Sequence, residues 1–250
     1  MAISVDDVYQ KVLAVANKEQ RGYITPQEFN LFADHSQKEI FEQYFYDLNQ
    51  FNRIPGNSMG HSDMKDVIES KISAFEIWTD IANTIFDTAG NIDLGQFSLY
   101  RIVEVMVDYS SNDNVAAPKE YKLVEEVTAK EYTKYSNSPL AKESEKRPVY
   151  IHDAFGFDRI KIIPPPPATG GVKINYIKKP STPKWGYVVS QNSNTALWNP
   201  GASTDFELHP SEESELVYKI LKLAGISMVR DDIMRAGQGM ESVQIQQEKQ

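Results

Sequence analysis

The sequence contains no cysteine. Disulfide bonds and thiolate metal sites are therefore excluded, and the stability of the chain must come from packing and from association with other chains. Its 4 histidines, at positions 35, 61, 152 and 209, are scattered and lack the i, i+4 spacing of a helical metal-binding pair. We therefore expect no metal and no cofactor.

Long apolar runs are missing as well. No segment approaches the ~18 consecutive apolar residues that a membrane helix needs. The stretch from Met1 to Gln10 lacks the basic-then-apolar pattern of a secretion signal. We therefore expect no membrane partner and a protein made in a cytoplasm.

Signatures of catalysis are also absent from the sequence. It has no G-x-x-x-x-G-K-[ST] phosphate loop, no G-x-G-x-x-G after a strand and no G-x-S-x-G elbow. Ser58, His61 and Asp63 are the residue types of a hydrolase triad, but triad members usually converge from distant segments. A glycine-rich linker with Ser62 as helix cap explains the same residues. We predict a non-enzymatic protein, with a hydrolase as an alternative.

Positive charge is in short supply, with 26 Lys and Arg against 35 Asp and Glu and a formal net charge of −9. A protein that grips nucleic acid needs clustered cations to neutralise phosphate. Only Tyr176 to Lys184, beside Trp185, interleaves aromatic and basic residues as single-strand-binding surfaces do. The enrichment in tyrosine serves protein interfaces equally well. The acidic charge argues against capture of nucleic acid, but it is compatible with a wall past which double-stranded DNA slides.

Helical spacing dominates the N-terminal part of the chain. It predicts a first helix with the apolar stripe Val5, Val8, Val12 and Ala16, and a third helix that Ser62 caps. Between them, a long second helix is predicted from Pro26 to about Phe51. Its apolar residues cover more than one face, so this helix needs partners on two sides, from its own domain or from a neighbouring subunit.

From Trp78 the pattern is that of strands. Leu99 to Tyr109 alternates apolar with polar residues from Ile102 to Val107, as a half-buried strand does, and Thr128 to about Ser136 fits a short polar helix. Three strands follow in PVYIHD, DRIKIIP and GGVKINYIKKP, and they predict a small antiparallel sheet. WGYVVSQNSNTALWNP predicts a hairpin with a polar tip at Gln191 to Asn194.

The C-terminal part predicts helices that serve assembly. Pro210 opens a helix, and Gly225 is expected to end it with a left-handed cap. Beyond Gly225, apolar residues recur at four, three, four and three residues, which is a heptad seam. Two heptads are too few for an isolated coil, so we predict an interface with another subunit or a partner. Its residues are Val229, Ile233, Ala236, Met240 and Val243.

These elements together predict an α+β protein. We expect a helical body over 1–77, a mixed β segment of the same body over 78–127, a small antiparallel β-domain over 128–209 and C-terminal assembly helices over 210–250.

The stretch NKEQRGYITPQEF, Asn17 to Phe29, has the outline of an EF-hand calcium loop. Arg21, however, stands where Ca²⁺ needs an anionic ligand. A helix–turn–helix corner explains the stretch better: Gly22 relieves the turn, and Thr25 and Glu28 form the capping box of the next helix. We predict a structural turn at these three residues and no metal; a calcium-responsive adaptor is the alternative.

The chain resembles one known group over most of its length. Its first 51 residues, MAISVDDVYQKVLAVANKEQRGYITPQEFNLFADHSQKEIFEQYFYDLNQF, are similar to the start of virion structural proteins of podovirus-like tailed phages, particularly marine and crAss-like phages. There this stretch opens a ring protein of the head-to-tail connector. The later segments VEEVTAKEYTKYSNSPL, RPVYIHD, FDRIKIIPPPP, VKINYIKKPSTP and DFELHPSEESELVYKILKLAG resemble the tail-adaptor layout of short-tailed phages. Trp78 to Lys122 carries no such motif.

The resemblance implies a virion protein that is assembled in the bacterial host cytoplasm. It implies a homo-oligomeric ring of twelve subunits between portal and tail, with the portal protein and adjacent tail ring proteins as partners. Double-stranded DNA would pass through the bore without sequence-specific binding. A distal tail-ring or head-completion protein is the alternative within the same virion.

Overall fold

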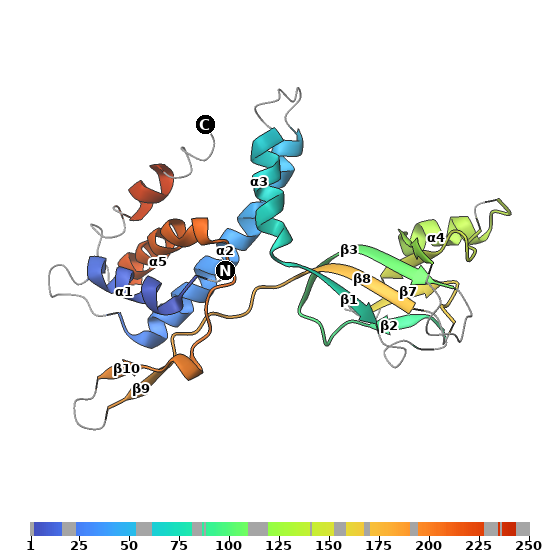
Figure 1. Cartoon of the computed structure of the whole chain (residues 1–250). Coiled ribbons are helices and arrows are strands. Elements are labelled where there is room, and N and C mark those ends of the chain that lie inside the picture. Colours follow the sequence, from blue (N-terminus) through green and yellow to red (C-terminus); the bar gives the residue numbers. More distant parts are fainter. Residues whose placement is uncertain are drawn as a thin grey trace. The chain divides into compact units, whose positions relative to one another are not determined.

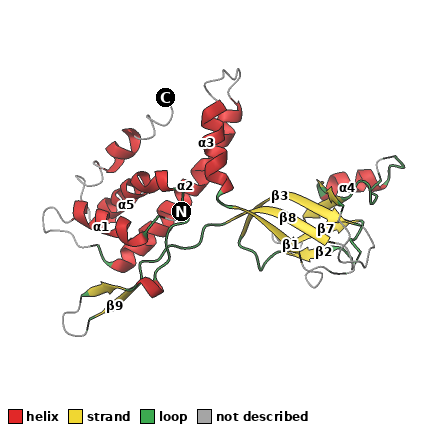
Figure 2. Ribbon diagram, in the orientation of Figure 1, coloured by secondary structure: helices red, strands yellow, loops and turns green. Residues whose placement is uncertain are grey.

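The computed structural model describes residues 3–16, 24–53, 62–81, 87, 89–109, 120–140, 142–152, 159–167, 171–190, 195–227, 235 and 237–243. It confirms an α+β fold (Figure 1). The chain forms two compact units: a helical unit of Met1–Ala74 and Pro180–Gln250, and a β unit of Phe75–Lys179. Helices and strands are largely segregated between these two units (Figure 2).

The β unit is inserted into the helical unit. The chain enters it at Phe75 and leaves it at Lys179, and the Phe75 carbonyl oxygen accepts a hydrogen bond from the Lys178 amide at 3.0 Å. Glu76 pairs with Ile177 one residue further in. The two ends of the insertion therefore lie side by side, as is common where one compact unit is inserted into another.

This division differs from the segments expected from sequence. The boundaries expected at 127/128 and 209/210 are not limits of the two compact units. The strands between residues 76 and 178 share one apolar core and form a single β unit. The residues from Pro180 to His209, expected in the β-domain, belong to the helical unit. Long-range strand pairing, which local pattern does not reveal, causes the difference.

In the helical unit, α1 (Val5–Ala16), α2 (Pro26–Arg53), α3 (Ser62–Ser73) and α5 (Glu213–Ser227) form the body. α2 packs against both α3 and α5, and α1 packs against α5. The predicted stripe of α1 is buried, which confirms that helix. α2 has two helical partners within its own unit, and a contact with a neighbouring subunit stays a prediction. Lys71 of α3 pairs at 2.5 Å with the buried Glu212 of η4 (Pro210–Glu212), just before α5.

An aromatic cluster joins α1 and α2 to the chain that returns from the β unit. The Tyr9 ring lies 4.8 Å from that of Phe29 and 4.3 Å from that of Trp185. Trp185 is 3% exposed, and its indole N–H donates to Asp6 at 2.9 Å. Tyr176 is also buried, in the core of the β unit. Neither ring offers the open face that stacking on single-stranded nucleic acid requires.

After Trp185 the chain forms the predicted hairpin. β9 (Tyr187–Val189) and β10 (Ala196–Trp198) pair antiparallel, with Val188 opposite Leu197. The tip, Gln191 to Asn194, lies outside the described residues. A short 3₁₀ turn, η3 (Pro200–Ala202), follows and leads back to the body of the helical unit.

The β unit contains two four-stranded sheets. One has the order β1 (Glu76–Ile81), β8 (Gly171–Lys178), β3 (Leu99–Asp108), β4 (Tyr121–Leu123), and the other β2 (Asn91–Asp93), β7 (Arg159–Ile163), β6 (Val149–His152), β5 (Glu125–Glu126). Neighbouring strands are antiparallel, except that β5 and β6 run parallel. α4 (Ala129–Ser136) is the predicted polar helix and begins with a capping box.

Both sheets contribute to one apolar core, which includes Ile102 and Val105 of β3, Ile160 and Ile162 of β7 and Ile174 of β8. The expectation of one small sheet from the last three strands is wrong in one respect: β6 and β7 lie in one sheet, while β8 lies between β1 and β3 in the other. β8 is buried along most of its length because it is an interior strand with neighbours on both sides.

The turn before β2 requires a glycine. Gly90 has φ +82° and its N–H donates to the Asp87 carbonyl at 2.9 Å. Its own carbonyl accepts from the Ile162 amide at 2.9 Å, and a Cβ at this position would collide with the Ile162 carbonyl oxygen. Only a residue without a side chain fits both the backbone angle and the close approach.

Replacing Gly90 by alanine is therefore expected to destabilise the protein by about 1–3 kcal/mol. Alanine is strained at the positive φ of this position, and its Cβ would collide with the Ile162 carbonyl oxygen. The control is Gly239→Ala, at a position in the helical stretch 237–243 where a Cβ meets nothing within 4 Å. Urea denaturation followed by circular dichroism measures both. Equal stability of Gly90→Ala and the unchanged protein would contradict the described turn.

Candidate assembly interface

The start of α2 carries the capping pair that the sequence indicates. The Thr25 amide donates to a Glu28 carboxylate oxygen at 3.0 Å, the Thr25 hydroxyl donates to the same oxygen at 2.7 Å, and the Glu28 amide donates to the Thr25 hydroxyl at 3.3 Å. The backbone and hydroxyl bonds from Thr25 hold the pKa of the Glu28 carboxyl below its usual value. Gly22 lies outside the described residues, so the turn itself stays a prediction.

Two residues of the predicted C-terminal seam are described. Met240 and Val243 lie in the helical stretch 237–243 and are 48% and 53% exposed. Side chains three apart on a helix lie on the same face, so the two form one apolar edge. Val229, Ile233 and Ala236 lie outside the described residues.

The stretch 237–243 packs on α5 at Gly237. A Cβ at Gly237 would lie 3.0 Å from the Lys222 amide nitrogen and 3.2 Å from the Tyr218 carbonyl oxygen. Gly237, which weakens helix propensity, therefore permits a close backbone approach here. Part of the C-terminal segment is thus docked on its own chain.

The prediction that Gly225 ends α5 is wrong. The helix continues through Gly225 to Ser227. Gly225 and its neighbour Ala224 are both buried. Tertiary packing outweighs the preference of glycine for a helix end at this position.

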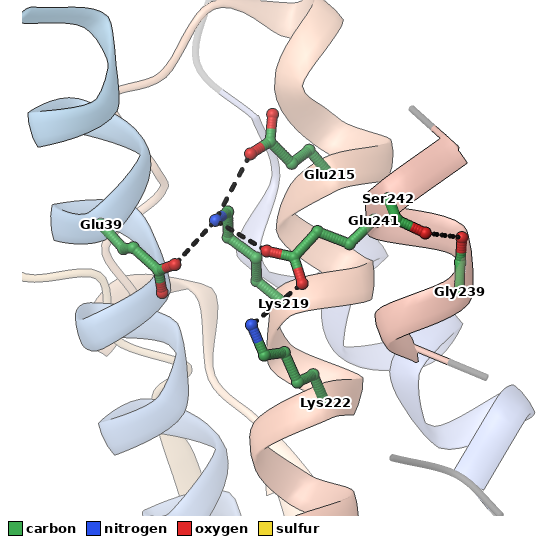
Figure 3. Close-up of polar contacts among 7 residues, drawn as sticks. All are labelled: Glu39, Glu215, Lys219, Lys222, Gly239, Glu241 and Ser242. Carbon is green, nitrogen blue, oxygen red and sulfur yellow. Dashed lines mark hydrogen bonds and ion pairs between the residues drawn. The ribbon is translucent and has the colours of Figure 1, made fainter. Parts of the chain in front are cut away.

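A buried lysine connects α2, α5 and the C-terminal stretch (Figure 3). The Lys219 side chain is 3% exposed, and its ammonium lies 2.9 Å from a Glu39 oxygen, 3.1 Å from a Glu241 oxygen and 3.5 Å from a Glu215 oxygen. Lys222 pairs with the other Glu241 oxygen at 3.0 Å. We call these five residues the lysine cluster.

The pKa shifts of Lys219 and Glu241 both favour the charged form. Burial alone lowers the pKa of Lys219, but the hydrogen bonds that its ammonium donates to Glu39 and Glu241 and the charges of Glu39 and Glu215 outweigh burial and raise that pKa above its usual value. Burial likewise raises the pKa of Glu241, and the bonds from Lys222 and Lys219 outweigh it and lower that pKa. Removing one partner from such a buried group is costly, because it leaves a charge without compensation.

The lysine cluster has the chemistry of a structural network. Each of its charged groups forms an ion pair with another member, which is the arrangement of a structural network. Within the described part of the chain, no group of three His, Asp or Glu residues could hold a metal ion. Ser58 and His61 of the hydrolase alternative, and the side chain of Asp63, lie outside the description.

Sequence reasoning missed this cluster. The i, i+4 spacing of Glu215 and Lys219 is a signal that could have pointed to it. Glu39 and Glu241, however, come from elements far away in the sequence, and only the tertiary fold brings them to Lys219.

Comparisons with known proteins identify no relative: no protein-family model matches the chain, and no curated protein is similar to it. In the described helices, no segment is long and apolar enough to cross a membrane. The functional conclusion therefore depends on the residues and on the resemblance that they carry.

Replacing Glu241 by glutamine is expected to loosen the stretch 237–243. The amide keeps the shape but not the charge, so Lys219 and Lys222 lose a charged acceptor. The free energy of local opening should fall by about 1–3 kcal/mol. Hydrogen exchange of the 237–243 amides measures this quantity. The control is Glu42→Gln, the same change on the exposed side of α2; if both variants exchange alike, the Glu241 bonds do not hold the stretch.

The docking should also depend on pH. The pKa of Glu241 is below its ordinary 4.5 in the folded state, so its contribution is complete above about pH 4.5 and is lost as the pH falls through the folded value. The pKa of Lys219 is above its ordinary 10.5, so its contribution is complete below about pH 10.5 and is lost above the folded value.

Exchange protection factors of 237–243 should accordingly stay constant between about pH 5 and 10 and fall on the acid side. In Glu241→Gln the acid dependence should shrink. If the protection factors of Glu241→Gln fall at low pH as much as those of the unchanged protein, carboxylates other than Glu241 cause the acid dependence.

Proposed function

We propose that this chain is a non-enzymatic structural protein of a phage virion. It forms a ring in the head-to-tail connector, next to the portal, and the ring surrounds the channel through which the genome passes. The proposal rests first on the resemblance of the N-terminal stretch and of the segments between Val124 and Gly225 to connector proteins of short-tailed phages.

One structural observation carries the assembly role. The lysine cluster anchors the stretch 237–243 through Glu241, while Met240 and Val243 on the same stretch are about half exposed. An anchored helix with an uncovered apolar edge is organised in advance for contact, so little conformational freedom is lost on binding. The portal protein is the partner proposed for this edge.

The charge of the chain fits the proposed channel. A net charge of −9 on each copy weakly repels DNA, and repetition around a ring of twelve subunits multiplies that field. Such a wall favours passage over capture. The adjacent tail ring proteins would contact the ring on its other side, and assembly would take place in the cytoplasm of the bacterial host, with the virion as final location.

The test is to disrupt the exposed edge and leave the anchored side intact. Met240→Glu with Val243→Glu is expected to weaken binding to portal-containing heads by about tenfold or more, because two charges would have to be desolvated at the contact. Ser242→Glu, at the exposed neighbouring position, is the matched control. Co-sedimentation with heads measures binding, and circular dichroism checks the fold.

Electron microscopy of the reconstituted particles then locates the ring. Density between portal and tail supports the proposed position, whereas density at the far end of the tail identifies the distal tail-ring alternative. Unchanged co-sedimentation of the double variant would mean that the portal contact lies elsewhere. A chain that joins no virion part at all would refute the connector role.

A further inference from the structure

The β9–β10 hairpin exposes apolar side chains on both of its faces. Val188 and Leu197 are paired opposite each other and are 54% and 57% exposed. Val189 and Trp198, on the other face, are 49% and 47% exposed. The ribbon has only two strands. An isolated two-stranded hairpin is at best marginally stable in water, so this one needs a surface to pack against.

The base of the hairpin is nevertheless firmly held. The Asn199 amide donates to the Gly186 carbonyl at 2.8 Å, and the Gly186 amide and the Trp198 indole both donate to the Ser203 hydroxyl at 3.0 Å. The Tyr187 ring stacks on the buried Trp185 at 5.9 Å. These contacts fix how the hairpin leaves the helical unit, away from α5 in Figure 1.

Charge indicates what covers the hairpin. Residues 185–204 contain no Asp, Glu, Lys, Arg or His and are the longest uncharged run of the chain. A surface that binds a cationic partner carries acidic side chains, and a surface that binds nucleic acid carries basic ones. Two copies that each carry −9 repel one another, so a contact between copies is best made by an uncharged element.

We infer that the β9–β10 hairpin is the arm through which one subunit holds the next, and that its apolar faces pack against a second copy of this chain. The inference rests on the proposed ring for its closed geometry: each copy gives one arm and receives one, and the contact repeats around the ring. It assigns the subunit–subunit contact to Val188, Val189, Leu197 and Trp198, separate from the portal-facing edge at Met240 and Val243.

The first experiment adds charge to one face of the arm. Val188→Asp with Leu197→Asp should weaken self-association of the full-length chain by about tenfold or more. The control is Leu140→Asp, which places the same residue at a leucine that is 99% exposed in the β unit. Sedimentation velocity over a concentration series measures association. Thermal melting checks that each variant is folded.

A second measurement covers the case in which the double variant does not fold. Because the chain has no cysteine, Val188→Cys can be labelled at one position with a polarity-sensitive dye. The emission should shift to the blue as the concentration of the chain rises, whereas dye on Leu140→Cys should not respond.

The outcomes separate this inference from the proposed function. Loss of association in the double variant, together with the blue shift, supports the arm. Association that survives the charges without a shift at position 188 overturns the arm and leaves the ring intact. A chain that stays monomeric at high concentration but still joins heads also overturns the arm. A chain that neither associates nor joins heads refutes both.

Discussion

The buried ammonium of Lys219 is the interaction on which the helical unit depends. A charge that is 3% exposed must find compensating acceptors. Glu215 on its own helix is not enough, since the other carboxylates come from Glu39 in α2 and Glu241 near the C-terminus. α2 and α5 must therefore lie side by side, and the chain must return across them. The buried Lys219 ammonium thus fixes the position of the stretch 237–243 through Glu241, while Met240 and Val243 stay exposed.

The inserted β unit shows a complementary principle. Its strands close around their own apolar core, and its two ends lie beside each other at Phe75 and Lys178. Such a unit constrains the helical unit little, because the chain enters and leaves the β unit at two adjacent positions. The elements that we assign to assembly, the hairpin and the C-terminal edge, both belong to the helical unit. In the proposed connector the contacts with copies and with the portal would then be made by one unit of each subunit.

Much of the fold could be predicted from the sequence because its elements are locally consistent. The stripe of α1, the capping box at Thr25 and the alternation in β3 are short-range signals, and the elements they predict are present. The candidate site was predictable only in part. Met240 and Val243 follow a heptad spacing that sequence reveals, but no spacing predicted that Glu241 between them would be buried.

The sequence by itself determined where helices and strands form, because capping, periodicity and turn residues act within a few positions. It also determined the charge balance that disfavours nucleic-acid capture. Only the tertiary structure decided that Gly225 remains helical, that β8 joins a different sheet from β6 and β7, and that Lys219 collects carboxylates from three elements. Each of these depends on burial and pairing between residues far apart in the chain, and the free energy of such contacts outweighs local preference.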